Sequence, residues 1–146
     1  MSSGTERITD ASADAVWSVL ADGWKYAMWV VGASRIRAVD SEWPAPGSAI
    51  HHSVGVWPVV LDDTTTVLDS QPGRELQLRA RALPFGTGHI TLRLHPQAYG
   101  CRIQMIEHAV SKPFSMLPDS LQHAAVHPRN SEALHRLALL AEQATG

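Results

Sequence analysis

The sequence predicts an α+β domain in which a curved antiparallel sheet of about seven strands wraps around a long C-terminal α-helix, with two short helices after the first strand. Three observations support this fold. Apolar and polar residues alternate over several segments in the second half of the chain. Turn-forming Gly and Pro residues separate these segments at strand-like intervals. The last segment instead repeats its apolar residues at helical spacing.

The composition indicates one domain over residues 1–146, long enough to bury a core, with 45% hydrophobic and 18% charged residues. The formal net charge of −2 and the scattered basic residues argue against a nucleic-acid-binding protein. A single cysteine, Cys101, excludes an internal disulfide. The N-terminus does not resemble a signal peptide, and no stretch approaches the ~20 apolar residues of a membrane span. We therefore expect a cytoplasmic protein without integral membrane association.

Two short helices are expected after a short first strand. Ser12 is a suitable N-cap, and Asp14 in the first turn interacts favourably with the helix dipole. Gly23 offers a stop, and residues 24–31 form the second helical segment. The apolar stripe of the first helix consists of Val16, Trp17 and Leu20.

Six strands are expected to follow. Within residues 74–83 and in the two segments after them, every second residue is apolar and its neighbours are polar, which is typical of an antiparallel sheet with one wet face. The turns between these segments contain Gly or Pro. The predicted strands cover residues 35–40, 49–57, 59–70, 74–83, 90–94 and 101–107.

The C-terminal segment returns to helical spacing over residues 130–143. Residues 117–126 are a candidate earlier part of the same helix, with Pro128 marking a kink or a break. A twisted sheet with one apolar face needs a cover, and only this helix is long enough to provide it. Its apolar face consists of Leu134, Leu137, Ala138 and Ala141.

This order of elements resembles the START-like, helix-grip superfamily called SRPBCC, which includes polyketide cyclase/dehydrase-like and lipid-transfer proteins. The matching residues are 13–22, Trp29, 34–36, 102–107 and 129–134, so the likeness covers essentially the whole chain. The resemblance implies an internal pocket between the concave sheet face and the last helix. It does not imply a reaction, because one fold hosts many functions.

The expected pocket lining follows from the alternation and the resemblance together. The small residues Ala80, Ala82 and Ala138 mildly favour leftover volume over a completely filled core, which is the alternative. Trp29, Trp43 and Trp57 lie near element ends, where they either plug the rim of the core or contact a ligand. The candidate ligand-binding residues are Trp29, His52, Val54, Trp57, Leu78, Ala80, Leu92, Ile103, Met105, Glu107 and Leu134.

Glu107 and His52 are the candidate catalytic residues. Glu107 shares the apparent inward face with Ile103 and Met105; buried there, it would have a raised pKa and could act as an acid. The alternative is a position near the strand end where Glu107 reaches solvent or pairs with a basic group. Grouping with Ile50 and Val54 favours His52 over its neighbour as the inward histidine.

An inward His52 could orient a ligand carbonyl or exchange a proton near neutral pH. The alternative is a histidine that a backbone carbonyl satisfies. Asp62 and Asp63 could supply a partner from the next strand, but the register cannot be set from the sequence.

We predict no metal site and no cofactor. His123 and His127 are four residues apart, which places both imidazoles on one helix face, but no third ligand is evident. Cys101 has no local activating motif for nucleophilic catalysis.

Three function classes remain open. The first is a non-catalytic carrier of a small hydrophobic molecule, lipid- or polyketide-like. The second is a polyketide aromatase/cyclase or dehydratase that uses Glu107 and His52, which requires the two side chains to converge within hydrogen-bonding distance. The third is an interaction module, such as a homodimer formed through an exposed sheet edge.

Overall fold

The computed structural model describes residues 4–31, 33–56, 58–81, 87–110 and 114–144. Seven strands and a long C-terminal helix account for most of this chain, as the sequence predicts. The strands are β1 (Thr5–Thr9), β2 (Ala33–Val39), β3 (Ala49–Val56), β4 (Val59–Gln71), β5 (Glu75–Arg81), β6 (Thr87–Pro96) and β7 (Cys101–Ala109). The helices are α1 (Ala13–Leu20), α2 (Tyr26–Trp29) and α3 (Asp119–Ala144), with 3₁₀ turns at Gly23–Lys25 and Phe114–Met116.

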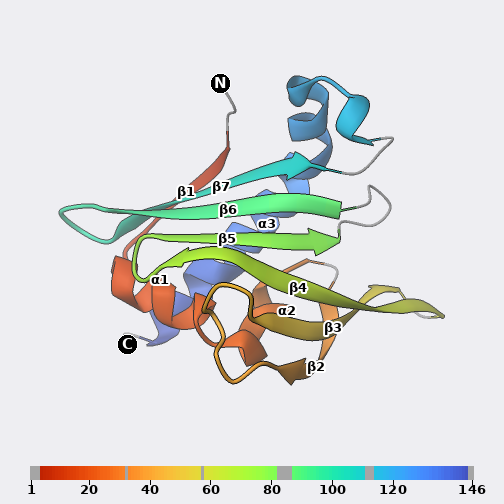
Figure 1. Ribbon diagram of the computed structural model, residues 1–146. Helices are drawn as coiled ribbons and strands as arrows, with labels where there is room; N and C mark the ends of the chain where they lie inside the picture. The colour runs from red at the N-terminus through yellow and green to blue at the C-terminus, as the bar shows by residue number, and fades with distance from the viewer. Residues whose placement is uncertain (1–3, 32, 57, 82–86, 111–113, 145–146) are drawn as a thin grey trace.

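The strands form one antiparallel sheet in the order β1-β7-β6-β5-β4-β3-β2 (Figure 1). From β2 to β7, each strand pairs with the next strand in the sequence, as in a series of β-hairpins. Only β1 departs from chain order, because it pairs with β7 at the far edge. The edges are therefore β1 and β2.

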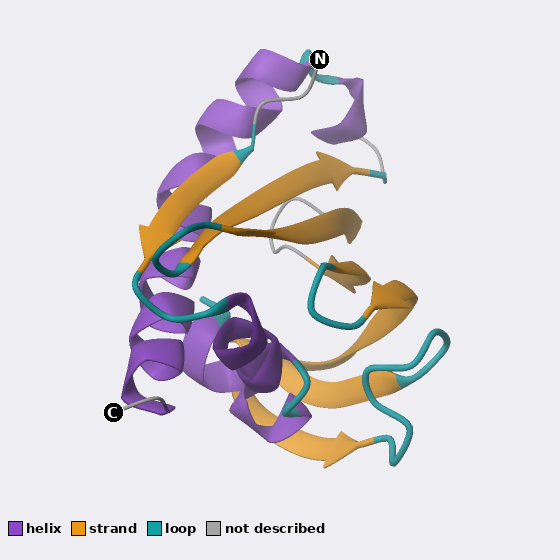
Figure 2. Cartoon of the chain, turned by 90° about the vertical axis from the view of Figure 1, so that its left-hand side faces the viewer, coloured by secondary structure: helices purple, strands orange, loops and turns teal. Residues whose placement is uncertain are grey.

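The sheet is curved, and α3 lies on its concave side (Figure 2). Irregularities in register occur in β2 and in β4, between Val67 and Asp69, and such bulges bend a strand and increase its twist. Helices α1 and α2 lie beside the C-terminal half of α3 (Figures 1 and 2). This arrangement is the predicted helix-grip fold.

The two short helices form largely where the sequence predicts them. The Ser12 hydroxyl caps α1 by accepting a hydrogen bond from the Ala15 amide at 3.1 Å. Trp17, which the sequence places in the apolar stripe of this helix, is only partly buried. Val19, which was not expected in the stripe, is buried in the core. The second helix is shorter than expected: a 3₁₀ turn precedes a four-residue α2.

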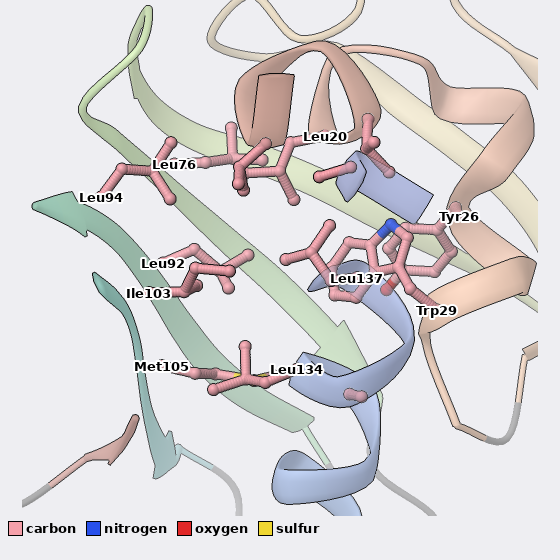
Figure 3. Packing of buried hydrophobic residues seen from close by; sticks show 14 of the residues in the cluster. Leu20, Tyr26, Trp29, Leu76, Leu92, Leu94, Ile103, Met105, Leu134 and Leu137 are labelled. Carbon is pink, nitrogen blue, oxygen red and sulfur yellow. The ribbon is translucent and has the colours of Figure 1, made fainter. Parts of the chain in front are cut away.

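The core lies between the concave sheet face and the helices (Figure 3). Leucines from β5 and β6 meet Leu134 and Leu137 of α3, both of which are fully buried. The opposite sheet face carries polar pairs, such as Arg93 with Glu75 at 2.8 Å. The predicted alternation is therefore confirmed on β5, β6 and β7. Its inward members there include Leu76, Leu78, Ala80, Leu92, Leu94, Ile103 and Met105.

The helix α3 begins at Asp119 and continues through Pro128 without a break. Of the kink or break expected at Pro128, the break does not occur, and the segment before the proline belongs to the same helix, as the sequence suggested. The proline nevertheless removes one backbone donor from the helix. Polar contacts on either side of this position hold the helix to the sheet: Thr5 Oγ1 lies 2.9 Å from His127 Nδ1, and Arg129 bonds to Glu107. None of the helices in the described ranges is long and apolar enough to cross a membrane.

Candidate functional site

A hydrogen-bonded chain of three buried side chains connects α2, β4 and β3 on the concave side of the sheet. The Tyr26 hydroxyl lies 2.9 Å from Thr65 Oγ1, and the same Thr65 oxygen lies 2.7 Å from His52 Nε2. All three residues are at most 3% exposed. In the β3–β4 register Thr65 pairs with Ile50, so its side chain is the diagonal neighbour of His52.

Two other rings pack against the phenol ring of Tyr26. Trp29, one helical turn later in the chain, meets it edge-on with ring centroids 5.5 Å apart. His52 approaches with ring centroids 5.3 Å apart. Figure 3 shows Tyr26 and Trp29 side by side, next to Leu137 of α3. The polar chain is thus embedded in aromatic and aliphatic side chains.

Burial keeps the titratable members of this chain neutral. It raises the pKa of Tyr26 to about 12; the hydrogen bond to Thr65 opposes this shift, and the negative charges of Glu107 and Asp63 add to it. Burial also lowers the pKa of His52, against the opposing effect of Asp63. Near neutral pH both Tyr26 and His52 are therefore uncharged.

Two buried nitrogen atoms of this cluster have no hydrogen-bond partner in the described chain: Trp29 Nε1 and His52 Nδ1. The nearby Ser53 backbone acts on the pKa of His52 as a weak hydrogen-bonding group would. It does not form a hydrogen bond to His52 Nδ1. Such orphaned polar atoms are rare in folded proteins and call for an explanation.

A partly buried ion pair lies on the same concave side, between β7 and α3. Arg129 Nη2 donates to both carboxylate oxygens of Glu107 at 2.7 Å. The Glu107 side chain is 5% exposed, whereas the Arg129 side chain is 26% exposed and reaches solvent. Of the alternatives that the sequence left open for Glu107, pairing with a basic group is the one found. The carboxylate is inward, on the face of Ile103 and Met105, as the alternation predicts.

The two candidate catalytic residues share the concave side but have different partners. Glu107 bonds to Arg129, and His52 bonds to Thr65. Within the described residues no hydrogen bond joins Glu107 to His52. Both contribute to the environment of Tyr26, because the charge of Glu107 acts on its phenol and the imidazole of His52 packs against its ring.

The structure places most of the expected lining residues on the concave side, where their contact with a ligand remains a prediction. His51, the outward neighbour of His52, bonds to Asp40 at 3.3 Å. Val54 lies on β3 opposite Leu61, but its side chain falls outside the description, as does Trp57. The inward, buried candidates are Trp29, His52, Leu78, Ala80, Leu92, Ile103, Met105 and Leu134.

Trp43 has a structural role, because its indole nitrogen donates to the Leu20 carbonyl at 3.1 Å. It lines an open surface hollow of about 500 Å³ between the segment that follows α1 and the end of β2, together with Asp22, Trp24 and Asp40. Both carboxylates already accept backbone hydrogen bonds there. This hollow therefore lacks unpartnered groups of the kind found around Tyr26.

The two helical histidines do lie together, with ring centroids of His123 and His127 5.0 Å apart. No group of three or more potential metal ligands occurs among the described residues.

The chain matches the family described as polyketide cyclase / dehydrase and lipid transport over residues 2–142. The chain belongs to this family. The match includes every strand and nearly all of α3, and thus both the Tyr26–Thr65–His52 chain and the Glu107–Arg129 pair. No curated protein sequence matches the chain.

Several solved structures have a fold similar to that of this chain. A protein from Nitrosomonas europaea shares 15% identity over 97% of this chain and 94% of its own, with a TM-score of 0.74. The di-domain ARO/CYC StfQ from the steffimycin biosynthetic pathway shares 12% identity over 98% of this chain and 51% of its own, also with a TM-score of 0.74. The Zhui aromatase/cyclase from Streptomyces sp. R1128 shares 17% identity over 100% and 96%, with a TM-score of 0.69. At these identities the similarity shows the fold alone.

Sequence reasoning missed Tyr26, Thr65 and Arg129 as members of the site. The sequence predicts only a strand over residues 59–70, which contains three consecutive threonines, and the register against β3 decides which of them meets His52. Tyr26 is 39 residues from Thr65 in the chain, and Arg129 is 22 residues from Glu107. The one available signal was the predicted inward position of Glu107, since a buried carboxylate requires a partner such as Arg129.

Proposed function

We propose that this chain binds and carries a small, mostly apolar molecule with one polar end, lipid- or polyketide-like in character, between the concave sheet face and α3. The observation that supports the proposal is the pair of buried, unpartnered nitrogens on Trp29 and His52. Their surroundings are apolar, so a ligand that fits there is apolar over most of its surface and polar where it meets these atoms.

The energetic argument concerns the cost of an unsatisfied polar atom. A buried donor or acceptor without a partner destabilises the folded state by about 1–3 kcal/mol. The combined cost of two such atoms is a substantial fraction of the ~5–15 kcal/mol free energy of unfolding of a typical domain. A ligand that bonds to them recovers this cost on binding, which makes the site a favourable place for the polar end.

The apolar part of the ligand would contact the inward side chains of the sheet and of α3. Leu92, Ile103 and Leu134 are fully buried members of this surface, and Ala80 and Ala138 contribute small side chains. Ala80 follows Arg79, which pairs with Thr66, so it lies beside Thr65 on the adjacent strand. Ala80 is thus the small inward residue closest to the polar chain on β5.

The proposal is tested with the neutral fluorescent probe N-phenylnaphthylamine. We expect saturable binding with one probe per chain and a blue-shifted emission, as in an apolar environment. The variant Ala80→Trp, which projects an indole inward, should abolish binding. The matched variant Ala125→Trp, on an exposed position of α3, should bind as the wild type does. Absence of saturable binding to the wild type, or equal binding by both variants, would contradict the proposal.

A cyclase- or dehydratase-type enzyme is the second candidate, and one observation favours it. His52 is neutral and hydrogen-bonded through Thr65 to Tyr26, and such a chain of exchangeable protons can take part in proton transfer near neutral pH. The proposed partnership with Glu107 has less support, because both Glu107 oxygens accept from Arg129. Turnover of a bound poly-β-ketone by the wild type that is lost in His52→Gln, with binding retained, would favour the enzyme over the carrier.

A further inference from the structure

The direction of the hydrogen bonds in the Tyr26–Thr65–His52 chain determines what the two unpartnered nitrogens can bind. Tyr26 retains its proton near neutral pH, since burial raises its pKa to about 12. Among the residues that the structure describes, its hydrogen-bond partner is Thr65 Oγ1, so the phenol donates to that oxygen. The Tyr26 end of the chain is therefore a donor to Thr65.

Thr65 has a single hydroxyl proton, and its remaining partner is His52 Nε2 at 2.7 Å. Because Thr65 already accepts from Tyr26, its own proton is satisfied only by donating to Nε2. Nε2 is then the unprotonated nitrogen, and the single proton of the neutral imidazole lies on Nδ1. The opposite direction would leave the Tyr26 proton without an acceptor in a fully buried position.

Both unpartnered nitrogens of the cluster are therefore hydrogen-bond donors. The indole nitrogen of Trp29 is always a donor, and the assigned tautomer makes His52 Nδ1 one as well. The two rings pack on the same Tyr26 ring, with centroid distances of 5.5 and 5.3 Å. The site thus offers two buried N–H groups beside one aromatic ring, and no described residue accepts from either.

The charges around the cluster disfavour an anion as the missing acceptor. The negative charges of Glu107 and Asp63 raise the pKa of Tyr26, and the opposing effect of Arg129 is smaller than either. Arg129 is also bound to Glu107 through both carboxylate oxygens. A further negative charge brought into this region would be repelled, with little solvent to screen it. A neutral acceptor avoids this repulsion.

We propose that the polar end of the ligand is a neutral carbonyl group, which accepts hydrogen bonds from Trp29 Nε1 and His52 Nδ1. A carbonyl oxygen has two lone pairs and no proton, which suits a site with donors only. Apolar ketones, esters and amides fit this description, whereas fatty-acid anions and hydrocarbons do not. This inference rests on the proposed function, because it specifies the ligand of the same interior site.

The experiment compares three probes that share one naphthalene body: the ketone prodan, its analogue with a methylene in place of the carbonyl, and the corresponding naphthoic acid as its anion. We expect the ketone to bind the wild type at least about tenfold more tightly than the methylene analogue, as two net hydrogen bonds allow. The carboxylate should bind more weakly than the ketone. Equal affinities of ketone and methylene analogue, or a carboxylate preference, would overturn the inference.

Two variants locate the effect. Trp29→Phe keeps an aromatic ring but removes the N–H, and His52→Gln keeps a polar group near the Nε2 position while removing Nδ1. Each should lower the ketone preference to about threefold, with the affinity of the methylene analogue unchanged. An unchanged ketone preference in both variants would contradict the assignment. If no probe binds the wild type, the proposed function fails; if the methylene analogue binds as tightly as the ketone, only the present inference fails.

A measurement on the ligand-free wild type tests the tautomer directly and does not depend on any variant. Long-range proton–nitrogen correlation spectra distinguish the protonated from the unprotonated ring nitrogen of His52. We expect the proton on Nδ1. A proton on Nε2 would reverse the hydrogen-bonded chain and overturn the inference.

Discussion

Replacement of Thr65 by valine tests the hydrogen-bonded chain on which the site depends. Valine has nearly the same shape as threonine, so the change removes the hydroxyl without leaving a large cavity. Thr65 is 0% exposed, and its oxygen is the partner of both Tyr26 and His52. Each of these two partners would be left buried and unsatisfied, at about 1–3 kcal/mol each. We therefore expect Thr65→Val to lower the free energy of unfolding by about 2–6 kcal/mol.

Urea denaturation at equilibrium measures this change, and two further variants make the result specific. Thr64→Val, at the exposed neighbouring position, is the matched control and should stay within about 0.5 kcal/mol of the wild type. In a double-mutant cycle, Tyr26→Phe should add little to Thr65→Val, because the phenol has then lost its partner already. A cost of Thr65→Val no larger than that of Thr64→Val, or additivity within about 0.5 kcal/mol, would refute the proposed chain.

Three further predictions concern pH, the ion pair and one tight turn. Because burial lowers the folded-state pKa of His52 from 6.5, the unfolded chain binds more protons as the pH falls through that value. The contribution of His52 to stability is thus present above about pH 6.5 and lost on acidification. Urea denaturation at about pH 7.5 and about pH 5.5 measures the loss, and the free energy of unfolding should fall less between these pH values in His52→Gln than in the wild type. Glu107→Gln should lower the free energy of unfolding by about 2 kcal/mol. This is less than the ~3–5 kcal/mol for breaking a fully buried ion pair, because the Arg129 side chain reaches solvent. An unchanged denaturation midpoint would contradict this prediction. Gly100→Ala should lower the free energy of unfolding by at least about 3 kcal/mol, because φ is +85° and the new methyl group would overlap the backbone of Thr9 at the end of β1. Gly47→Ala, with φ +87° and open space around it, should cost only about 1 kcal/mol; similar costs for both variants would show that the close approach is unimportant.

The sequence predicts the sheet and the inward faces well, because period-two alternation is a local property of the chain. Leu76, Leu78 and Leu92 lie on the buried face as their spacing requires. The same alternation places His52 and Glu107 inward. Of the two outcomes expected at Pro128, a kink or a break, the break did not occur, since a helix held by contacts on both sides of a proline tolerates the missing donor.

The partners of the inward polar residues could not be predicted, because they depend on strand register and on the docking of helices. Asp63, a partner that the sequence suggested for His52, does lie opposite it in the β3–β4 register. The hydrogen bond nevertheless goes to Thr65, two residues further along β4. Tyr26 reaches the same hydroxyl from α2, whose position is set by packing against the sheet and α3 rather than by any local pattern.

The central claim is that the chain binds a small apolar molecule on the concave side of the sheet, beside Tyr26. Isotope-filtered NOE spectra of the wild type saturated with prodan test this claim most directly. We expect contacts from the bound naphthyl ketone to Trp29 and to the methyl groups of Leu92 and Leu134. Saturable binding with contacts only to exposed residues, such as those around Trp24, would contradict it.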